Sequence, residues 1–358
     1  MVAVPARAAV APANATAEER GRRSIELPQI TAKAVFVADV TAGVELWSRS
    51  ADEPLPPAST TKIVTALVAR RSLDPEERVT IAPEDLVDPA VFSNAGLLPG
   101  DRLTVRDLLA AMLVASAGDA ARALARTAGQ RLAPPGVDPV AAFVEAMNQE
   151  AGRLGLVRSR FATPDGRDTS GQVATARELA IAAAELLADP LLAGLVATAR
   201  YAIAIEGPNA RTVFLDNTNQ LLGLPGVIGV KTGTSPAAGQ CLVLAVRRGN
   251  DTLLVVLLGS VDRYGDARAL LAWLDGRYRW VTLDSRSFPE LAGLADQGLV
   301  PAIVPTVLVP AEAVDWVGLV IQPPDAAQQR SGTVRLRFGT TDLAVVPLIR
   351  VGHDRQGR

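Results

Sequence analysis

The feature that most constrains the fold of this chain is a pair of apolar runs joined by a short turn near residue 250. QCLVLAVRR (240–248) and TLLVVLLG (252–259) flank the turn Gly249-Asn250-Asp251. Two apolar runs joined in this way predict a β-hairpin. The fold must therefore contain an antiparallel sheet, and the segment Lys231-Thr232-Gly233 stands just before its first strand.

Other segments predict a second hairpin, a set of helices and a β-rich end. AVFVADV (34–40) and VELWS (44–48) are joined by a turn at 41–43 and predict the hairpin. Capping residues and apolar periodicity predict the helices: one from Ile63 with Ser59 at its N-terminal end, one from Thr104 to about Ser116, one resuming after Ala117-Gly118, one from Asp138 to Leu154, one capped by Thr175, and one from Asp266 to Trp273. From about Ser285, short Val-rich runs separated by Pro, Gly and Ser predict a small all-β region.

Composition excludes several classes of protein. The chain has 358 residues, 49% of them hydrophobic and 21% charged, with a formal net charge of −2. This length allows one large domain and a smaller one, and the charge balance argues against nucleic acid as the main partner. The single cysteine, Cys241, excludes an internal disulfide and a cysteine-rich metal site. Since the single histidine, His353, lies in a polar C-terminal tail, hydrolytic serine chemistry needs another base.

Lysine is scarce in this chain. Of 36 basic residues only Lys33, Lys62 and Lys231 are lysines. Two of the three fall within Ser59-Thr60-Thr61-Lys62 and Lys231-Thr232-Gly233. A lysine can be desolvated into a neutral base, whereas a guanidinium stays charged at any working pH. The scarcity therefore predicts that these two amines serve a task that arginine cannot perform.

Ser59 and Lys62 have the spacing of a nucleophile and its base. Residues three apart on a helix share a face, so the two side chains come within hydrogen-bond reach. Burial and a second cation can lower the pKa of a lysine until it accepts the hydroxyl proton. A backbone N–H at the helix N-terminus can also face a developing oxyanion. Taken alone, a serine and lysine at this spacing equally fit a capped helix with a surface lysine.

The segment Lys231-Thr232-Gly233 offers a positive charge, a hydroxyl and a glycine that lets the substrate backbone approach closely. On an edge strand, the N–H of Thr234 is the natural second oxyanion donor beside that of Ser59. Taken alone, the segment equally fits a turn before a strand.

The combination of S-x-x-K, a serine at a helix break and K-T-G before an apolar strand is a known constellation. The chain resembles the D-alanyl-D-alanine carboxypeptidases, low-molecular-weight penicillin-binding proteins of the serine DD-peptidase family. The resemblance covers roughly residues 30 to 280 in the family's order, in the stretches PPASTTKIVTAL, LLPGDRLTVRDLLAAMLVASAGDAA, TPDGRDTSGQVATARELA, NTNQLL, GVIGVKTGTSPAAGQCLV and RYGDARALLAW.

The resemblance implies a role for each matched residue. Ser59 is expected to be acylated, with Lys62 as its general base and Ser116 relaying a proton to the leaving amine. Lys231 is expected to stay charged and to hold Ser116 and the substrate carboxylate. Thr232 is expected to hydrogen-bond that carboxylate, with Gly233 and Thr234 beside it on the strand and Arg263 assisting, ten residues before Trp273. No metal and no cofactor are implied.

Three positions depart from the family pattern. The second motif, Ser-x-Asn in the family, is Ser116-Ala117-Gly118 here, so the amide that contacts the first-motif lysine is missing. Asp119 is not expected to replace it, because one step along a helix turns a side chain by about 100°. Thr234 stands where the family often has histidine or tyrosine. Asp165 takes a place often held by histidine, where we expect it to affect loop structure more than chemistry.

The resemblance implies a serine DD-carboxypeptidase that removes the terminal D-alanine from peptidoglycan stem peptides ending in D-Ala-D-Ala and is inhibited by β-lactams. A DD-endopeptidase uses the same machinery. A penicillin-binding-fold protein with weak turnover, binding cell-wall peptides or protein partners, is the alternative from another class, and Gly118 supports it. Glu178 falls on the helix after the 161–180 loop, so we expect no counterpart of the deacylating glutamate of class A β-lactamases.

The implied fold is of the α/β class: a DD-peptidase and β-lactamase-like antiparallel sheet covered by helices, with a helical subdomain and a small C-terminal all-β domain. We expect a leader or linker at 1–30, either a weak or truncated export signal or a disordered leader, a catalytic domain at 31–284 and the β-rich domain at 285–358. The family acts outside the cytoplasmic membrane, so a secreted, extracytoplasmic protein is expected. Its frequent C-terminal amphipathic anchor is not expected, because VPLIRVGHDRQGR has too little apolar length.

Overall fold

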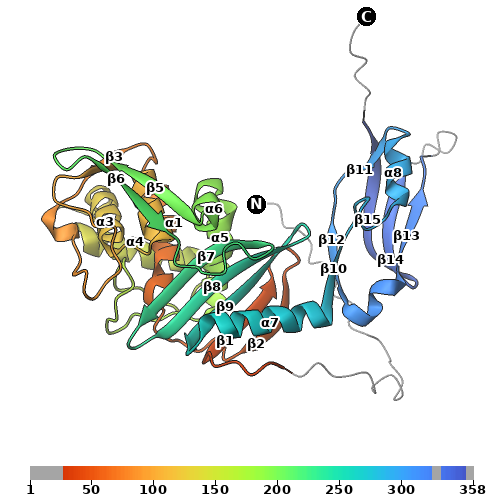
Figure 1. The fold of residues 1–358 in the computed structure, drawn as a ribbon, viewed down its shortest axis with the longest axis horizontal. Coiled ribbons are helices and arrows are strands. Elements are labelled where there is room, and N and C mark those ends of the chain that lie inside the picture. Colours follow the sequence, from red (N-terminus) through yellow and green to blue (C-terminus); the bar gives the residue numbers. More distant parts are fainter. Residues whose placement is uncertain (1–26, 325–331, 352–358) are drawn as a thin grey trace, which may run out of the picture.

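A five-stranded antiparallel sheet forms the centre of the larger part of the molecule (Figure 1). The computed structural model describes residues 27–324 and 332–351. The strand order is β2-β1-β9-β8-β7, with bounds Ala34–Asp39 (β1), Val44–Arg49 (β2), Val227–Ser235 (β7), Gly239–Arg248 (β8) and Asp251–Ser260 (β9). Both predicted hairpins are confirmed, and β7, which carries Lys231, is an edge strand.

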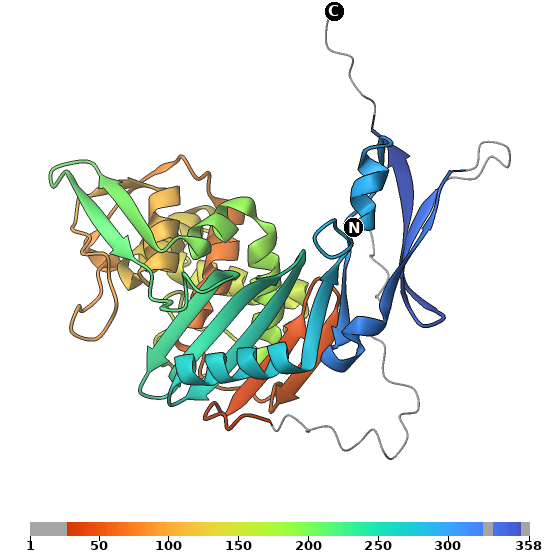
Figure 2. The same ribbon diagram turned by 45° about the vertical axis from the view of Figure 1, so that its right-hand side comes forward.

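The apolar runs of β8 and β9 are continuous because both faces of the sheet are covered. Cys241, Val243 and Ala245 belong to the core on one face, whereas Leu242, Leu244 and Val246 belong to the core on the other. Side chains alternate along a strand, so a strand buried on both sides has no polar positions to alternate with. Helix α7 (Arg263–Arg277) lies across the second face, as Figure 2 shows.

Six helices form the layer on the first face and the helical region beside it. They are α1 (Lys62–Ser72), α2 (Val105–Val114), α3 (Gly118–Leu132), α4 (Pro139–Leu154), α5 (Ala176–Ala188) and α6 (Pro190–Ala197). The expected caps are confirmed, since the side chains of Thr104, Asp138 and Thr175 accept backbone N–H groups of the following turn. Helix α7 begins earlier than predicted because Asp262 caps it.

Two small two-stranded sheets were not predicted from the sequence. They pair β3 (Arg78–Thr80) with β4 (Arg102–Thr104), and β5 (Arg200–Ile205) with β6 (Arg211–Asp216). Strand β3 has only three residues, and alanines occupy exposed positions of β5, so the alternation of buried and exposed positions is hard to see in the sequence. Two 3₁₀ turns, η2 (Ala58–Thr61) and η3 (Pro83–Asp85), complete this part of the fold.

The C-terminal region is built mainly of strands and has its own apolar core. One sheet has the order β11-β15-β14-β13, and a second pairs β10 with β12. Their bounds are Tyr278–Thr282 (β10), Leu299–Pro301 (β11), Thr306–Pro310 (β12), Val317–Gln322 (β13), Thr333–Phe338 (β14) and Thr341–Arg350 (β15). The expected β-rich appendage is confirmed, with a short helix, α8 (Glu290–Ala295), and a 3₁₀ turn, η4 (Ala311–Trp316), added to it.

Hydrogen bonds join this region to the five-stranded sheet. The indole of Trp280 donates to Asp39 over 2.7 Å, and the backbone N–H of Asn250 donates to Thr306 Oγ1 over 3.0 Å. The domain limits expected at residues 30 and 284 stay predictions, and most of the predicted leader lies outside the described residues. Among the described residues no single helix is long and apolar enough to cross a membrane; α5 and α6 together reach that length only as a pair bent by 107°.

Candidate active site

Ser59 lies in the 3₁₀ turn that leads into α1. Ala58, just before it, has φ of +46°, an unusual backbone conformation for a residue other than glycine. Lys62 is the first residue of α1, and its Nζ lies 2.9 Å from Ser59 Oγ. The predicted pairing of nucleophile and amine is thus present in the structure.

The side chain of Lys62 is buried, and its ammonium also donates to the carbonyl of Asp165. Burial lowers the pKa of Lys62 to about 8, against the opposing influence of the carboxylates of Asp165 and Asp119. A lysine with this pKa has a substantial neutral fraction near neutral pH, and neutral amine is the form that can accept the serine proton.

Gly118 is the first residue of α3 and stands where the family has the asparagine of its Ser-x-Asn motif. Its N–H donates to the carbonyl of Ser93 over 2.8 Å, and a Cβ placed here would lie 3.2 Å from Val87 Cγ1. The carboxylate of Asp119 accepts the N–H groups of Ala95 and Leu97. These bonds occupy Asp119 in holding the 93–97 segment, which agrees with the expectation that it does not replace the amide.

Lys231 and Thr232 lie buried on the edge strand β7. Lys231 Nζ donates to the carbonyl of Thr232 over 3.0 Å, and Thr232 Oγ1 donates to Thr218 Oγ1 over 2.7 Å. Burial, together with the neighbouring cations Lys62 and Arg263, lowers the pKa of Lys231 well below its ordinary value. That Lys231 stays charged in the working site remains a prediction, and an anion bound beside it would raise this pKa again.

Gly233 lies directly against η2 (Ala58–Thr61), the turn that carries Ser59 and is called the nucleophile turn below. A Cβ at this position would be 2.9 Å from the backbone nitrogen of Ser59 and 3.1 Å from both Ala58 Cβ and the carbonyl oxygen of Pro57. We expected Gly233 to let the substrate backbone approach closely, but in the structure its close neighbour is the 3₁₀ turn η2 that carries Ser59. The absence of a side chain at Gly233 sets how near β7 and Ser59 can come, and Thr234 follows at the end of that strand.

Ser116 lies at the break between α2 and α3, where the sequence placed it, and it has φ of +61°. Its neighbour Val114 accepts the N–H of Thr218 over 3.0 Å, which links this corner to Thr232 through the Thr218 hydroxyl. Within the described residues, no hydrogen bond joins Ser116 to Lys62 or Lys231. The corner is in place, while the proton relay assigned to Ser116 stays a prediction.

Arg263 projects from the start of α7 to the end of β7 that carries Thr234. Its guanidinium donates to the carbonyls of Gly233 over 2.7 Å and Cys241 over 2.9 Å, and also to Thr234 Oγ1. The cation is therefore fixed beside the K-T-G segment, where it contributes positive potential for a carboxylate. The role of Arg263 in binding a carboxylate stays a prediction.

The loop between α4 and α5 contributes residues that sequence reasoning missed. The carbonyl of Asp165 contacts Lys62, and a Cβ at Gly166 would be 2.2 Å from the carbonyl oxygen of Ala58, so the loop packs on the nucleophile turn. Asp168 accepts from Ser235 Oγ over 2.6 Å and from the N–H of Ala237 over 3.1 Å, which ties the loop to the β7–β8 turn. The turn Pro164-Asp165-Gly166 signalled a loop, but nothing in the sequence indicated which carbonyl would face the lysine.

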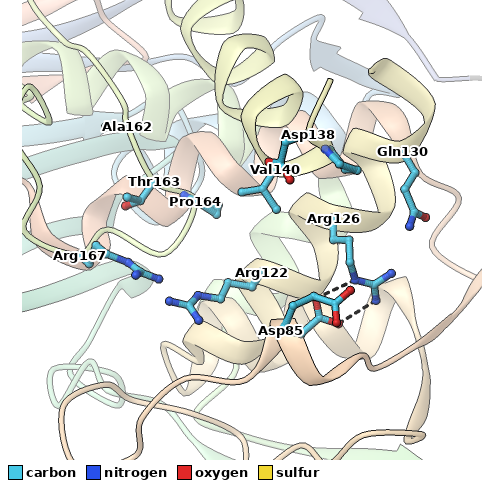
Figure 3. Close-up of a pocket in the computed structure, with 12 residues that line it drawn as sticks. Asp85, Arg122, Arg126, Gln130, Asp138, Val140, Ala162, Thr163, Pro164 and Arg167 are labelled. Carbon is cyan, nitrogen blue, oxygen red and sulfur yellow. Dashed lines mark hydrogen bonds and ion pairs between the residues drawn. The ribbon is translucent and has the colours of Figure 1, made fainter. Parts of the chain in front are cut away.

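Two cavities lie on either side of this loop. One, of about 310 Å³, is lined by Pro57, Ala58, Arg167 and Asp168 among others, and so opens next to Ser59. The other, of about 460 Å³, lies between the loop, α3 and the start of α4 (Figure 3).

Comparison with known proteins agrees with this geometry. The chain matches the family described as D-alanyl-D-alanine carboxypeptidase over residues 21–261. It is similar to D-alanyl-D-alanine carboxypeptidase DacF of Bacillus subtilis, at 31% identity over 69% of this chain and 62% of DacF, and to the D-alanyl-D-alanine carboxypeptidase of Streptomyces strain K15, at 33% identity over 69% of this chain and 88% of that protein. The crystal structure of penicillin binding protein 6B from Escherichia coli has a TM-score of 0.66 at 26% identity, covering 90% of this chain and 96% of that one. The family and the fold expected from the motifs are confirmed, and the chain spans less than two thirds of DacF.

Proposed function

Because this chain belongs to the D-alanyl-D-alanine carboxypeptidase family, we propose that it hydrolyses the last peptide bond of peptidoglycan stem peptides ending in D-Ala-D-Ala. The observation that carries this proposal is the Lys62 amine 2.9 Å from Ser59 Oγ, buried and with its pKa lowered to about 8. A substrate in the cell wall also implies that the protein works outside the cytoplasmic membrane.

In the acylation step, neutral Lys62 takes the proton of Ser59 as Oγ attacks the carbonyl carbon of the penultimate D-alanine. The backbone N–H groups of Ser59 and Thr234 stabilise the oxyanion that forms, because Gly233 brings the two segments together. Ser116 passes a proton to the departing nitrogen, the C–N bond breaks, and D-alanine leaves. The stem peptide is then bound to Ser59 as an ester.

The free carboxylate of the substrate lies against Lys231, Thr232 and Arg263 in this proposal. Lys231 is buried beside two other cations, so an incoming carboxylate supplies a countercharge that raises the pKa of Lys231 and favours its ammonium form. When this carboxylate binds, the Thr232 hydroxyl turns its single O–H from Thr218 Oγ1 to the carboxylate. Such a site rejects a peptide without a free C-terminus near the cleaved bond, because its cations would stay unpaired.

Water completes the cycle by hydrolysing the ester. Deacylation after a β-lactam is expected to be slow. Class A β-lactamases use a glutamate for this step, and Glu178, which lies on α5, is instead occupied by structural hydrogen bonds. Its carboxylate accepts from the N–H of Arg158 over 2.9 Å and from Ser159 Oγ over 2.5 Å. β-Lactams are therefore expected to acylate Ser59 and remain attached.

The test compares the wild-type chain with Ser59→Ala. A fluorescent penicillin should label only the wild type, and the wild type should release D-alanine from a D-Ala-D-Ala peptide. Absence of label at saturating reagent would refute the proposed acyl-enzyme. Label without D-alanine release would favour a binding protein with weak turnover, and cleavage of a cross-linked peptide dimer in place of the linear peptide would favour an endopeptidase.

A further inference from the structure

The site lacks the amide that the family places beside the first-motif lysine, yet the Lys62 amine is held on two sides. One contact is Ser59 Oγ, and the other is the carbonyl of Asp165. A carbonyl oxygen only accepts hydrogen bonds, so it can bind an N–H of Lys62 whether the amine is charged or neutral. With one N–H bound there, the lone pair of the neutral amine is left for the hydroxyl of Ser59.

The Asp165 carboxylate is itself fixed by two arginines. Only 1% of its side chain is exposed, and Oδ2 lies 3.1 Å from Arg122 Nε and 2.6 Å from Arg167 Nη2. Arg167 also donates its backbone N–H to Oδ1 over 3.2 Å, and Arg122 donates to the carbonyl of Leu86 over 2.6 Å. A buried carboxylate with two guanidinium partners has little freedom to move, so the backbone of residue 165 is fixed with it.

Arg122 connects this arrangement to the missing amide. It lies on α3 one turn after Gly118, so both positions share a face of the helix. Figure 3 shows Arg122 and Arg167 reaching toward one another along the cavity behind the loop, while Arg126, a turn farther along α3, pairs with Asp85. Helix α3 thus reaches Lys62 through Arg122 and Asp165, where the family reaches it through an amide at position 118.

We propose that Asp165, fixed by Arg122 and Arg167, is a positioning residue that holds the Lys62 amine against Ser59 in place of the amide absent at Gly118. The inference concerns the same site as the proposed function and rests on it for its catalytic meaning. The contact itself, however, is measurable without any turnover.

The scarcity of lysine gives a direct measurement. Because the chain has only three lysines, ¹³C labelling of the lysine ε-carbons gives three signals, and Lys62→Arg and Lys33→Arg assign them. The charged groups facing the Lys62 amine are Asp165 from the loop, Asp119 from α3 and Lys231 from β7. The Lys62 signal in the wild type should titrate with a midpoint near pH 8.

Three variants, each of which replaces a charged side chain with a neutral amide, test the contact between Lys62 and Asp165. Asp165→Asn removes a negative charge near the amine and should lower the midpoint by about half a pH unit or more, whereas Arg122→Gln removes the opposing charge and should raise it by a smaller amount. Arg126→Gln is the matched control, since it breaks a similar ion pair on the same helix without touching Asp165, and should leave the midpoint unchanged.

Acylation by a fluorescent penicillin at about pH 9.5, where most of Lys62 is neutral in every variant, should fall about tenfold in the first two variants and stay within about twofold in the control. If Asp165→Asn does not fold, the half-exposed Arg167→Gln carries the same test. The proposal is overturned if folded Asp165 or arginine variants leave both the midpoint and the acylation rate at the wild-type values, or if the control changes as much as they do. If the variants show the expected shifts of the Lys62 midpoint but the wild type is never acylated, the proposed function is refuted and the Lys62 contact stands.

Discussion

The sharpest structural prediction concerns Gly233. An alanine here would place Cβ 2.9 Å from the Ser59 nitrogen and 3.1 Å from the carbonyl oxygen of Pro57, and both are backbone atoms that no rotamer change can move. Ordinary contact begins near 3.4 Å, so β7 and the nucleophile turn must separate by about 0.5 Å. A misplacement of ~1 Å can cost about 10²-fold in rate, so half of that predicts a loss of about tenfold or more in acylation.

Overpacking should also destabilise the Gly233→Ala variant by about 1–3 kcal/mol. The assay is the second-order rate of acylation by a fluorescent penicillin, with thermal unfolding measured in parallel. Gly152→Ala on α4 is a suitable control, because a Cβ there meets nothing within 4 Å and helix propensity favours alanine by about 1 kcal/mol. Wild-type acylation and unchanged Tm in Gly233→Ala would show that the closeness of strand and turn does not position the nucleophile.

Four further predictions follow from other features of the structure. Because neutral Lys62 is the reactive form and its pKa is about 8, acylation should rise about tenfold per pH unit below pH 8 and level off above it; Lys62→Arg should abolish acylation at every pH. The free energy of unfolding, measured with denaturant, should increase between about pH 8 and the ordinary lysine pKa of 10.5, because in this range Lys62 holds its proton more tightly in the unfolded chain than in the folded one. Gly118→Asn should lower Tm, since its Cβ would lie 3.2 Å from Val87 Cγ1, and adding Val87→Ala should recover most of the loss, whereas no recovery would place the clash elsewhere. Thr104→Ala removes the hydroxyl that accepts the Asp107 N–H over 3.0 Å and should cost about 1 kcal/mol in chemical unfolding with acylation unchanged; a neutral effect would mean that α2 does not depend on its cap.

Local signals predicted most of the elements that carry the motifs. The apolar runs 240–248 and 252–259, joined by a short turn, satisfy their backbone groups and bury their side chains as paired strands, and Thr104, Asp138 and Thr175 cap the starts of helices. The hairpin at 200–216 and the pairing of 78–80 with 102–104 went unpredicted, because three-residue strands are too short to show a pattern and alanine at exposed positions of 200–205 hides the alternation.

The sequence by itself determined the three motifs, the family they belong to, and the pairing of Ser59 with Lys62, since a three-residue spacing on a helical turn leaves the two side chains few other arrangements. It could not determine which groups far apart along the chain surround that pair. The tertiary structure decided that the Asp165 carbonyl, 103 residues from Lys62, binds the amine, and that Gly233 is bare because Ser59 lies against it. It also decided that burial lowers the pKa of both Lys62 and Lys231, because desolvation depends on everything packed around a group and not on its neighbours in sequence.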